Sequence, residues 1–270
     1  MSAFTNHFAF EFKTGLRNAT SMLMNYLFPL GFFAMMGLVM TQVNPGYTEI
    51  IIPGMILIAL MAAALLGLPG PLVEAREAGI YRSYKVNGVP AVSILLIPML
   101  TTVFHALIAS GIIAVSANPL FDGRNPQNWW ALALVTVVAA LNFGCLGALI
   151  SVVSNDSRSV VLWSQLIFLP SILLGGLMMP LNILPESVLN FSFMLPTTYA
   201  MQAYSGLAYR QSTLIDPLRA LGVLAVGAAL AITGALHLFK WDNQNVSRGG
   251  KTLLLAVLAW LPYIAGVFLR

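Results

Sequence analysis

The chain has 270 residues, of which 59% are apolar and only 8% are charged, and its formal net charge at pH 7 is +4. Because soluble domains carry roughly 25% charged residues, this composition excludes an ordinary soluble domain, and its high hydrophobicity excludes intrinsic disorder. The single cysteine, Cys145, excludes an internal disulfide framework and a multi-cysteine metal site. The basic residues lie between apolar runs, which is typical of membrane topology and argues against nucleic acid as a partner.

The first 19 residues are predicted to form an amphipathic helix that lies on the membrane surface. Phe4, Phe8, Phe12 and Leu16 are spaced four residues apart, so a helix places them on one face. A frayed tail with chance spacing is the alternative. The segment lacks an apolar centre, which argues against a cleavable signal peptide.

Seven stretches approach the roughly 20 apolar residues that a membrane-crossing helix needs. Their continuous hydrophobicity favours helices over the alternating strands of a transmembrane barrel, so the predicted fold is an all-α membrane protein. The seventh stretch is the shortest. The predicted spans are Thr20–Met40, Ile51–Val73, Ala91–Ala117, Trp129–Val153, Val160–Leu181, Pro217–Phe239 and Thr252–Leu269.

The distribution of lysine and arginine predicts a cytoplasmic N-terminus. With that orientation nine of the 13 basic residues lie on the inner side and four on the outer side. Seven spans would then leave the C-terminus outside. Because the seventh span is marginal, the side of the membrane on which the C-terminus lies is left undecided.

Residues 74–90, here called the charged segment, hold the densest charge in the chain and connect the second and third spans. Helical spacing is plausible from Glu74 to Tyr84, with Gly88 and Pro90 ending the helix. Such a helix suits contact with a soluble partner. A solvated loop that only carries topogenic charge is the equal alternative from composition.

Residues 182–216, here called the apolar segment, are too hydrophobic for an ordinary external loop. Pro185 and Pro196 divide the segment into two short pieces. These pieces are predicted either to dip back into the outer leaflet under a cover of protein, or to lie flat at the interface with tyrosines as anchors.

The spans contain little that would support chemistry. His105 and His237 are the only ionisable residues in the span interiors, and the absence of a carboxylate there weakens an ion-coupled pump. Residues 249–252 resemble the end of a phosphate-binding loop, but the glycine that the full pattern requires is Asn245. The chain is therefore not expected to use ATP alone, and no reactive set for an intramembrane enzyme is apparent.

Four motifs in this order resemble the type-2 family of ABC transporter permeases, the membrane subunits of many bacterial exporters of drugs, lipids and polysaccharides. The first is the pattern E-x-x-E-x-G-x-x-R in the charged segment, and the most specific part is the stretch from Gly175 to Ala200. The later motifs are Gly175–Leu181 (GGLMMPL), Leu184–Glu186 (LPE) and Leu195–Ala200 (LPTTYA). The resemblance covers residues 1–241, while residues 242–270, a linker and an additional C-terminal helix, depart from it.

This resemblance implies a six-helix bundle that works as a dimer or with a similar permease in a bacterial inner membrane. A separate ABC ATPase subunit would bind ATP and magnesium, so no cofactor is expected in this chain. The charged segment would be the coupling helix to that ATPase, through Glu74, Arg76, Glu77, Gly79 and Arg82. The loop Ser154–Ser159 would be a second contact, and the apolar segment would form external re-entrant helices that close an outer gate, with gate candidates Met179, Pro180, Leu184, Pro185, Pro196 and Tyr199.

The leading hypothesis is the transmembrane subunit of an ATP-driven exporter whose cargo is an amphipathic drug, a lipid or a glycan. An apolar groove at the dimer interface would contact this cargo and membrane lipids, and its candidate residues are Phe28, Phe32, Phe33, Leu169, Leu173 and Leu177. The alternatives are a stand-alone secondary transporter and, with less support, an intramembrane enzyme.

Overall fold

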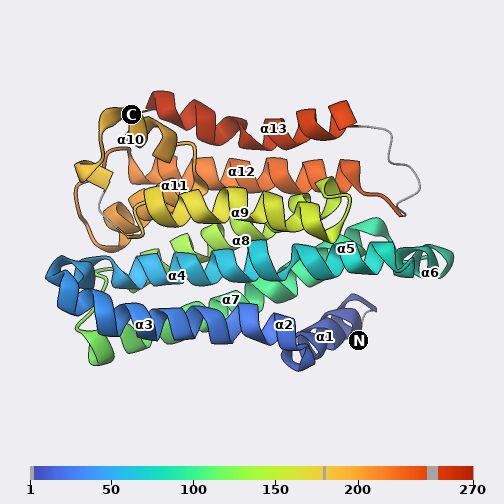
Figure 1. Cartoon of the computed structure of the whole chain (residues 1–270), viewed down its shortest axis with the longest axis horizontal. Coiled ribbons are helices and arrows are strands. Elements are labelled where there is room, and N and C mark those ends of the chain that lie inside the picture. The colour runs from blue at the N-terminus through green and yellow to red at the C-terminus, as the bar shows by residue number, and fades with distance from the viewer. Residues whose placement is uncertain (1–2, 179–180, 242–248, 270) are drawn as a thin grey trace.

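The computed structural model describes residues 3–178, 181–241 and 249–269, which form a bundle of helices aligned roughly side by side (Figure 1). Within the described residues no strand occurs, as the all-α prediction requires. The elements of the first half are α1 (Ala3–Arg17), α2 (Ala19–Met22), η1 (Leu23–Leu27), α3 (Phe28–Val43), η2 (Pro45–Glu49), α4 (Ile51–Met61), η3 (Ala62–Gly67), α5 (Pro69–Glu77), α6 (Ile80–Val86) and α7 (Ala91–Phe121).

The second half continues with two further long helices, a cluster of short helices and two final helices. These elements are α8 (Trp129–Val153), α9 (Ser157–Leu174), η4 (Leu181–Ile183), α10 (Glu186–Ser192), α11 (Pro196–Ala203), η5 (Tyr204–Ala208), α12 (Pro217–Leu238), α13 (Gly249–Gly266) and η6 (Val267–Leu269). Among these elements η1, η3 and η5 are π-helical turns.

Among the described residues, six helical stretches are long and apolar enough to cross a membrane, and they coincide with the first six predicted spans. They are Ala19–Val43, Ile51–Glu77, Ala91–Phe121, Trp129–Val153, Ser157–Leu174 and Pro217–Leu238. The predicted end of the fifth span at Leu181 is wrong, because the helix stops at Leu174. Gly176 has φ +84°, a left-handed conformation that favours glycine and turns the chain out of the helix.

The second span is the centre of the bundle. In an apolar stretch of 18 residues within this span, 94% of the residues are buried, whereas only 28% are buried in the corresponding stretch of the first span. A helix that is hydrophobic on all sides must be covered on all sides. In Figure 1, α3 and α9 lie on opposite sides of α4, so the first and fifth spans are separated by the second.

Small residues on α8 bring it close to two neighbouring helices. A Cβ added at Gly147 would lie 2.0 Å from the carbonyl oxygen of Ala64, and one added at Gly144 would lie 2.7 Å from Val103. The α8 backbone therefore approaches the backbone of the second span closely at Gly147, while Gly144 leaves room for the Val103 side chain.

The apolar segment forms two short helices that begin after Pro185 and at Pro196, as the sequence predicts. Every residue of α11 is buried, and the helix packs against α4, α8, α9 and α12. By contrast, α10 is largely exposed at the end of the bundle. The second piece therefore dips into the bundle, while the first lies at its surface.

The N-terminal segment is helical, which rules out the frayed tail. Phe8 and Phe12 of α1 contact Phe104 of α7 edge to face, with ring centroids 6.5 and 5.7 Å apart. The apolar face of this helix is thus partly occupied by α7, while Phe10 remains exposed.

The C-terminal helix α13 packs along α12 (Figure 1). The Asn142 side chain donates a hydrogen bond to the Tyr263 hydroxyl at 2.6 Å, and the Tyr199 hydroxyl donates to the Tyr263 carbonyl at 2.8 Å. The Trp260 indole donates to the Met194 carbonyl at 3.0 Å. The described apolar part, Val257–Gly266, is shorter than a membrane span, so the seventh span stays a prediction.

Candidate functional site

The charged segment lies at the opposite end of the bundle from α10 and α11, with α6 at the tip (Figure 1). The predicted continuous helix from Glu74 to Tyr84 is wrong, because α5 ends at Glu77 and α6 begins at Ile80. Gly79, with φ +75°, makes the break, since this left-handed conformation is costly for other residues. The predicted end of the helix near Gly88 is confirmed: α6 stops at Val86, and Gly88 also has positive φ.

The five residues assigned to coupling do not share one environment. The side chains of Glu74, Glu77 and Arg82 are exposed at this end of the bundle. Arg76 is only 5% exposed and points inward. Its guanidinium donates hydrogen bonds to the carbonyl oxygens of Ser151 at 3.0 Å and Ser154 at 2.5 Å. The carbonyls at a helix C-terminus have no partner within the helix, so Arg76 satisfies the end of α8 and ties α5 to it.

Tyr81 is a second anchor of the charged segment, and the sequence gives little sign of its importance. Its hydroxyl donates a hydrogen bond to the Leu72 carbonyl at 2.8 Å, and its ring lies 5.7 Å from that of Phe239. Burial raises the pKa of Tyr81 above its usual range, so the hydroxyl stays protonated as a donor. The contact holds α6 against α5.

The loop predicted as a second partner contact begins beside Arg76. Asp156 caps α9: its carboxylate accepts a hydrogen bond from the Ser159 backbone N–H at 2.7 Å, in a capping box with Ser159. The hydrogen bonds from the Ser159 backbone and side chain hold the pKa of Asp156 below its usual range. The fully exposed carboxylate thus fixes the first turn of α9.

Acid is expected to loosen the start of α9. Because the pKa of Asp156 is lower in the folded chain than in an unfolded one, the cap contributes stability above the unfolded pKa of about 3.9 and loses it as pH falls through the lower folded value. Hydrogen-exchange protection of residues 157–160 should therefore decrease below about pH 4. Asp156→Asn, which caps without titrating, should remove this dependence. Equal acid sensitivity of the wild type and Asp156→Asn would contradict the assignment.

The groove candidates are not brought together within one chain. Phe28 and Phe32 are half-buried and stack with centroids 5.9 Å apart, while Phe33 lies in the core against Phe121. On the other side of α4, Leu169 and Leu173 are 52% and 59% exposed. Leu177 is buried beyond the end of α9. A groove lined by the candidates of the first span together with those of α9 needs a second chain. The assignment of these residues to a groove stays a prediction.

Of the gate candidates, Met179 and Pro180 lie outside the described residues. Leu184 and Pro185 lie in the turn that leads into α10, whereas Pro196 and Tyr199 are buried on α11. The hydrogen bond from Tyr199 to α13 connects this buried helix to the C-terminal helix. Their role in a gate stays a prediction.

The described residues offer no group of three or more His, Cys, Asp or Glu side chains that could hold a metal ion. His105, the buried histidine of the third span, instead shares a 2.7 Å hydrogen bond between its Nδ1 and the Tyr26 hydroxyl. His105 is therefore a buried, hydrogen-bonded residue of the bundle core.

Comparison with protein families gives one match. A family model described as "ABC-2 family transporter protein" matches residues 13–237, a range that includes the six long apolar stretches of the described residues except Leu238, the last residue of the sixth. No curated protein and no solved structure shows significant similarity to the chain. The matched region ends before α13.

Proposed function

The chain belongs to the ABC-2 family of transporter proteins, and from this premise we propose that it is the transmembrane subunit of an ATP-driven exporter. It is a multi-pass membrane protein whose described residues include six long apolar helices, and a separate ATPase subunit would supply the energy. We place it in a bacterial inner membrane with a cytoplasmic N-terminus, because this orientation puts most basic residues on the inner side.

The observation that carries the proposal is the surface of the charged segment. Val86 is 88% exposed and Ile80 is 43% exposed, and both lie on α6, beside the exposed charges of Glu77 and Arg82. Apolar side chains at the tip of a projecting helix, surrounded by charge, suit a protein interface with an apolar centre and a polar rim. A loop that only carried the basic residues that orient the chain in the membrane would not need these exposed apolar side chains.

The contacts that hold the charged segment against the bundle would let it act as a rigid lever. The α5 helix continues the central second span, and Arg76 and Tyr81 join it to α8 and to α6. A displacement of α6 by nucleotide binding in the partner would therefore move the second span and the inner end of α8 together. Such coupled movement of packed helices can switch access from one side of a membrane to the other.

A second permease copy, identical or similar, would complete the cargo path. The outward face of α9 carries an exposed row of leucines, Leu162, Leu166, Leu169 and Leu173, and the first span exposes a comparable apolar face. Because α4 separates these faces within the chain, the first span of one copy would meet the fifth span of the other. The apolar, uncharged lining suits an amphipathic drug, a lipid or the lipid part of a glycan.

The proposal is tested by co-purification with an ABC ATPase subunit and by transport in vesicles. Val86→Asp, which changes an exposed side chain without disturbing internal packing, should reduce ATPase association by roughly tenfold or more. The pair Glu77→Gln and Arg82→Gln should reduce coupled ATPase activity and transport similarly.

The matched control neutralises one acidic and one basic residue at the other end of the bundle. Glu49 and Arg124 form an exposed ion pair at 3.5 Å, and Glu49→Gln with Arg124→Gln should leave association unchanged. Transport by vesicles that contain this chain without any ATPase would refute the proposal and favour a secondary transporter.

A further inference from the structure

The C-terminal helix α13 is fixed to the bundle by one buried tyrosine. The Tyr263 side chain is fully buried, in a slot between α8 and α12. The Asn142 amide on α8 donates hydrogen bonds to the Tyr263 hydroxyl at 2.6 Å and to the Leu224 carbonyl on α12 at 2.7 Å. A Cβ added at Gly227 of α12 would lie 2.2 Å from the Tyr263 hydroxyl, so the slot depends on this glycine. Asn142 and Gly227 together hold α13 in one position along the bundle.

From this position α13 reaches the two short helices of the apolar segment, which lie at the same end of the bundle as the C-terminal end of α13 (Figure 1). The Trp260 indole donates a hydrogen bond at 3.0 Å to the Met194 carbonyl, in the turn between α10 and α11. The Tyr199 hydroxyl of α11 donates at 2.8 Å to the Tyr263 carbonyl in the last turn of α13. A Cβ added at Gly266 would lie 2.1 Å from the Tyr199 hydroxyl, so α13 in turn carries a glycine that admits a tyrosine of α11.

The bond to α13 differs from the other side-chain hydrogen bonds described for α11. Thr198 shares a hydrogen bond with the Ser192 hydroxyl at 2.9 Å, and the Gln202 side chain accepts one from the Leu214 backbone N–H at 2.6 Å. Both partners belong to the apolar segment, so these bonds can persist when the segment moves as a unit. Tyr199 instead bonds to an element outside the segment. This bond must break if α11 leaves the bundle.

The turn before α11 relies on α13 for a backbone partner. Because α11 has only eight residues, too few for a stable helix on its own, its position is set by its neighbours. The backbone of the turn is irregular, and a carbonyl that is shielded from water needs a hydrogen-bond donor. Trp260 supplies that donor to the half-buried Met194. Release of Trp260 would leave this carbonyl to find another partner.

The helix α13 lies outside the region that the ABC-2 family model matches. That region ends at residue 237, whereas α13 begins at Gly249. The bonds of Tyr263 and Trp260 therefore connect the matched region to an element beyond it. A restraint that joins two long helices to a short buried helix suits control over the movement of the short helix.

We propose that α13 is a clamp that keeps α11 in its buried position, with Tyr263 as its anchor and Trp260 as its contact to the turn before α11. The short helix leaves the bundle only when this clamp releases. In the exporter described above, the clamp would set how readily the outer end of the bundle opens, and that consequence rests on the proposed function. The hold on α11 itself is a property of this chain alone.

Hydrogen exchange of the purified full chain in nanodiscs, without an ATPase, tests the clamp, because exchange of buried amides requires local opening. Trp260→Phe keeps an aromatic ring but removes the indole N–H. It should speed exchange in α11 by about fivefold, the factor that corresponds to the loss of one buried hydrogen bond. Gly227→Ala places a methyl group in the Tyr263 slot and should speed exchange in α11 by roughly tenfold or more.

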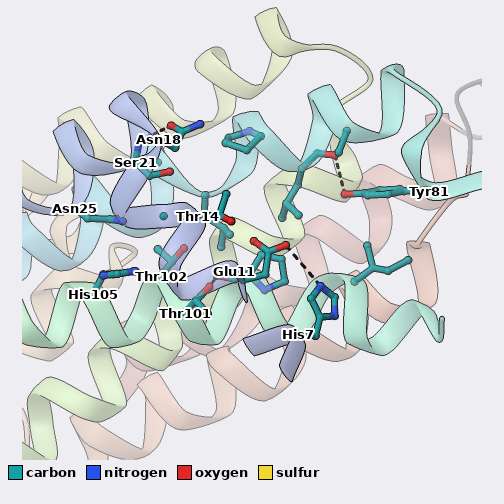
Figure 2. Close-up of a pocket in the computed structure, with 18 of the residues that line it drawn as sticks. His7, Glu11, Thr14, Asn18, Ser21, Asn25, Tyr81, Thr101, Thr102 and His105 are labelled. Carbon is teal, nitrogen blue, oxygen red and sulfur yellow. Dashed lines mark hydrogen bonds and ion pairs between the residues drawn. The ribbon is translucent and has the colours of Figure 1, made fainter. Parts of the chain in front are cut away.

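Two matched variants and an internal reference serve as controls. Gly222→Ala adds the same methyl group to α12 where no heavy atom lies within 4 Å, and Trp130→Phe changes a tryptophan of α8 that is 87% exposed. Both should leave exchange in α11 as in the wild type. The internal reference is Thr101, Thr102 and His105 of α7, which line a polar cavity at the charged end of the bundle (Figure 2). Exchange there should be the same in every variant.

Faster exchange in α11 of Trp260→Phe, with unchanged exchange in α7, supports the clamp. The proposal is overturned if α11 of Trp260→Phe exchanges at the wild-type rate, or if exchange in α7 rises equally, since that would mean a general loss of packing. Should Gly227→Ala loosen α7 as well, the Trp260→Phe result decides. No ATPase is present in these measurements, so a failure of the clamp and a failure of the proposed function are distinguishable.

Discussion

Replacing Gly147 with alanine is expected to lower the stability of the folded chain by about 3 kcal/mol. The added Cβ would lie 2.0 Å from the Ala64 carbonyl oxygen and 3.1 Å from its carbonyl carbon, both of which are backbone atoms. A flexible side chain could move aside, but here α8 must shift away from the second span. The measurement is thermal unfolding of the purified chain in detergent, where the midpoint should fall by roughly 5–10 °C.

Gly111→Ala is the matched control, because it adds the same methyl group to another long helix. No heavy atom lies within 4 Å of the Cβ position at Gly111, so the unfolding midpoint should stay the same or rise slightly. Equal stability of Gly147→Ala and Gly111→Ala would mean that α8 and the second span are farther apart than described.

Replacing Arg76 with methionine is expected to detach the inner end of α8 from the second span. Two charge-assisted hydrogen bonds to the Ser151 and Ser154 carbonyls would be lost from a buried position, at a cost of about 3–5 kcal/mol. Hydrogen exchange at residues 151–156 of the isolated chain should become faster. Arg76→Lys should recover part of the protection, because an ammonium cannot reproduce the two-armed geometry of the guanidinium.

The same experiment distinguishes two roles for Arg76. If the residue serves mainly as a contact for the ATPase, Arg76→Met should weaken association without changing hydrogen exchange in the isolated chain. If it ties α5 to α8, the exchange changes before any partner is added. Glu74→Gln, an exposed substitution on the same helix, should leave exchange at residues 151–156 unchanged.

The long apolar helices could be predicted from sequence because each carries about 20 or more residues of consistent hydrophobicity, and their ends were less certain. The fifth span ends early, at Leu174, because a left-handed turn at Gly176 follows, and apolar residues continue beyond it without marking the change. The charged segment breaks at Gly79 for the same reason. Hydropathy records which residues avoid water, while backbone conformation at a single glycine decides where a helix stops.

The candidate site was harder to predict because it depends on contacts between distant segments. Arg76 has the same position in the sequence motif whether it faces a partner or the end of α8. Only the folded chain shows that Arg76 is buried and bonded to Ser151, which lies 75 residues further along the sequence.

The length of α7 has a consequence for the surrounding lipids. Its 31 residues extend about 46 Å at 1.5 Å per residue, whereas the hydrocarbon core of a typical bilayer is about 30 Å thick. The helix must therefore lean away from the bilayer normal or emerge into the headgroup layers, and its packed neighbours must share that tilt. The tilt of the whole bundle therefore depends on the acyl-chain length of the surrounding lipids.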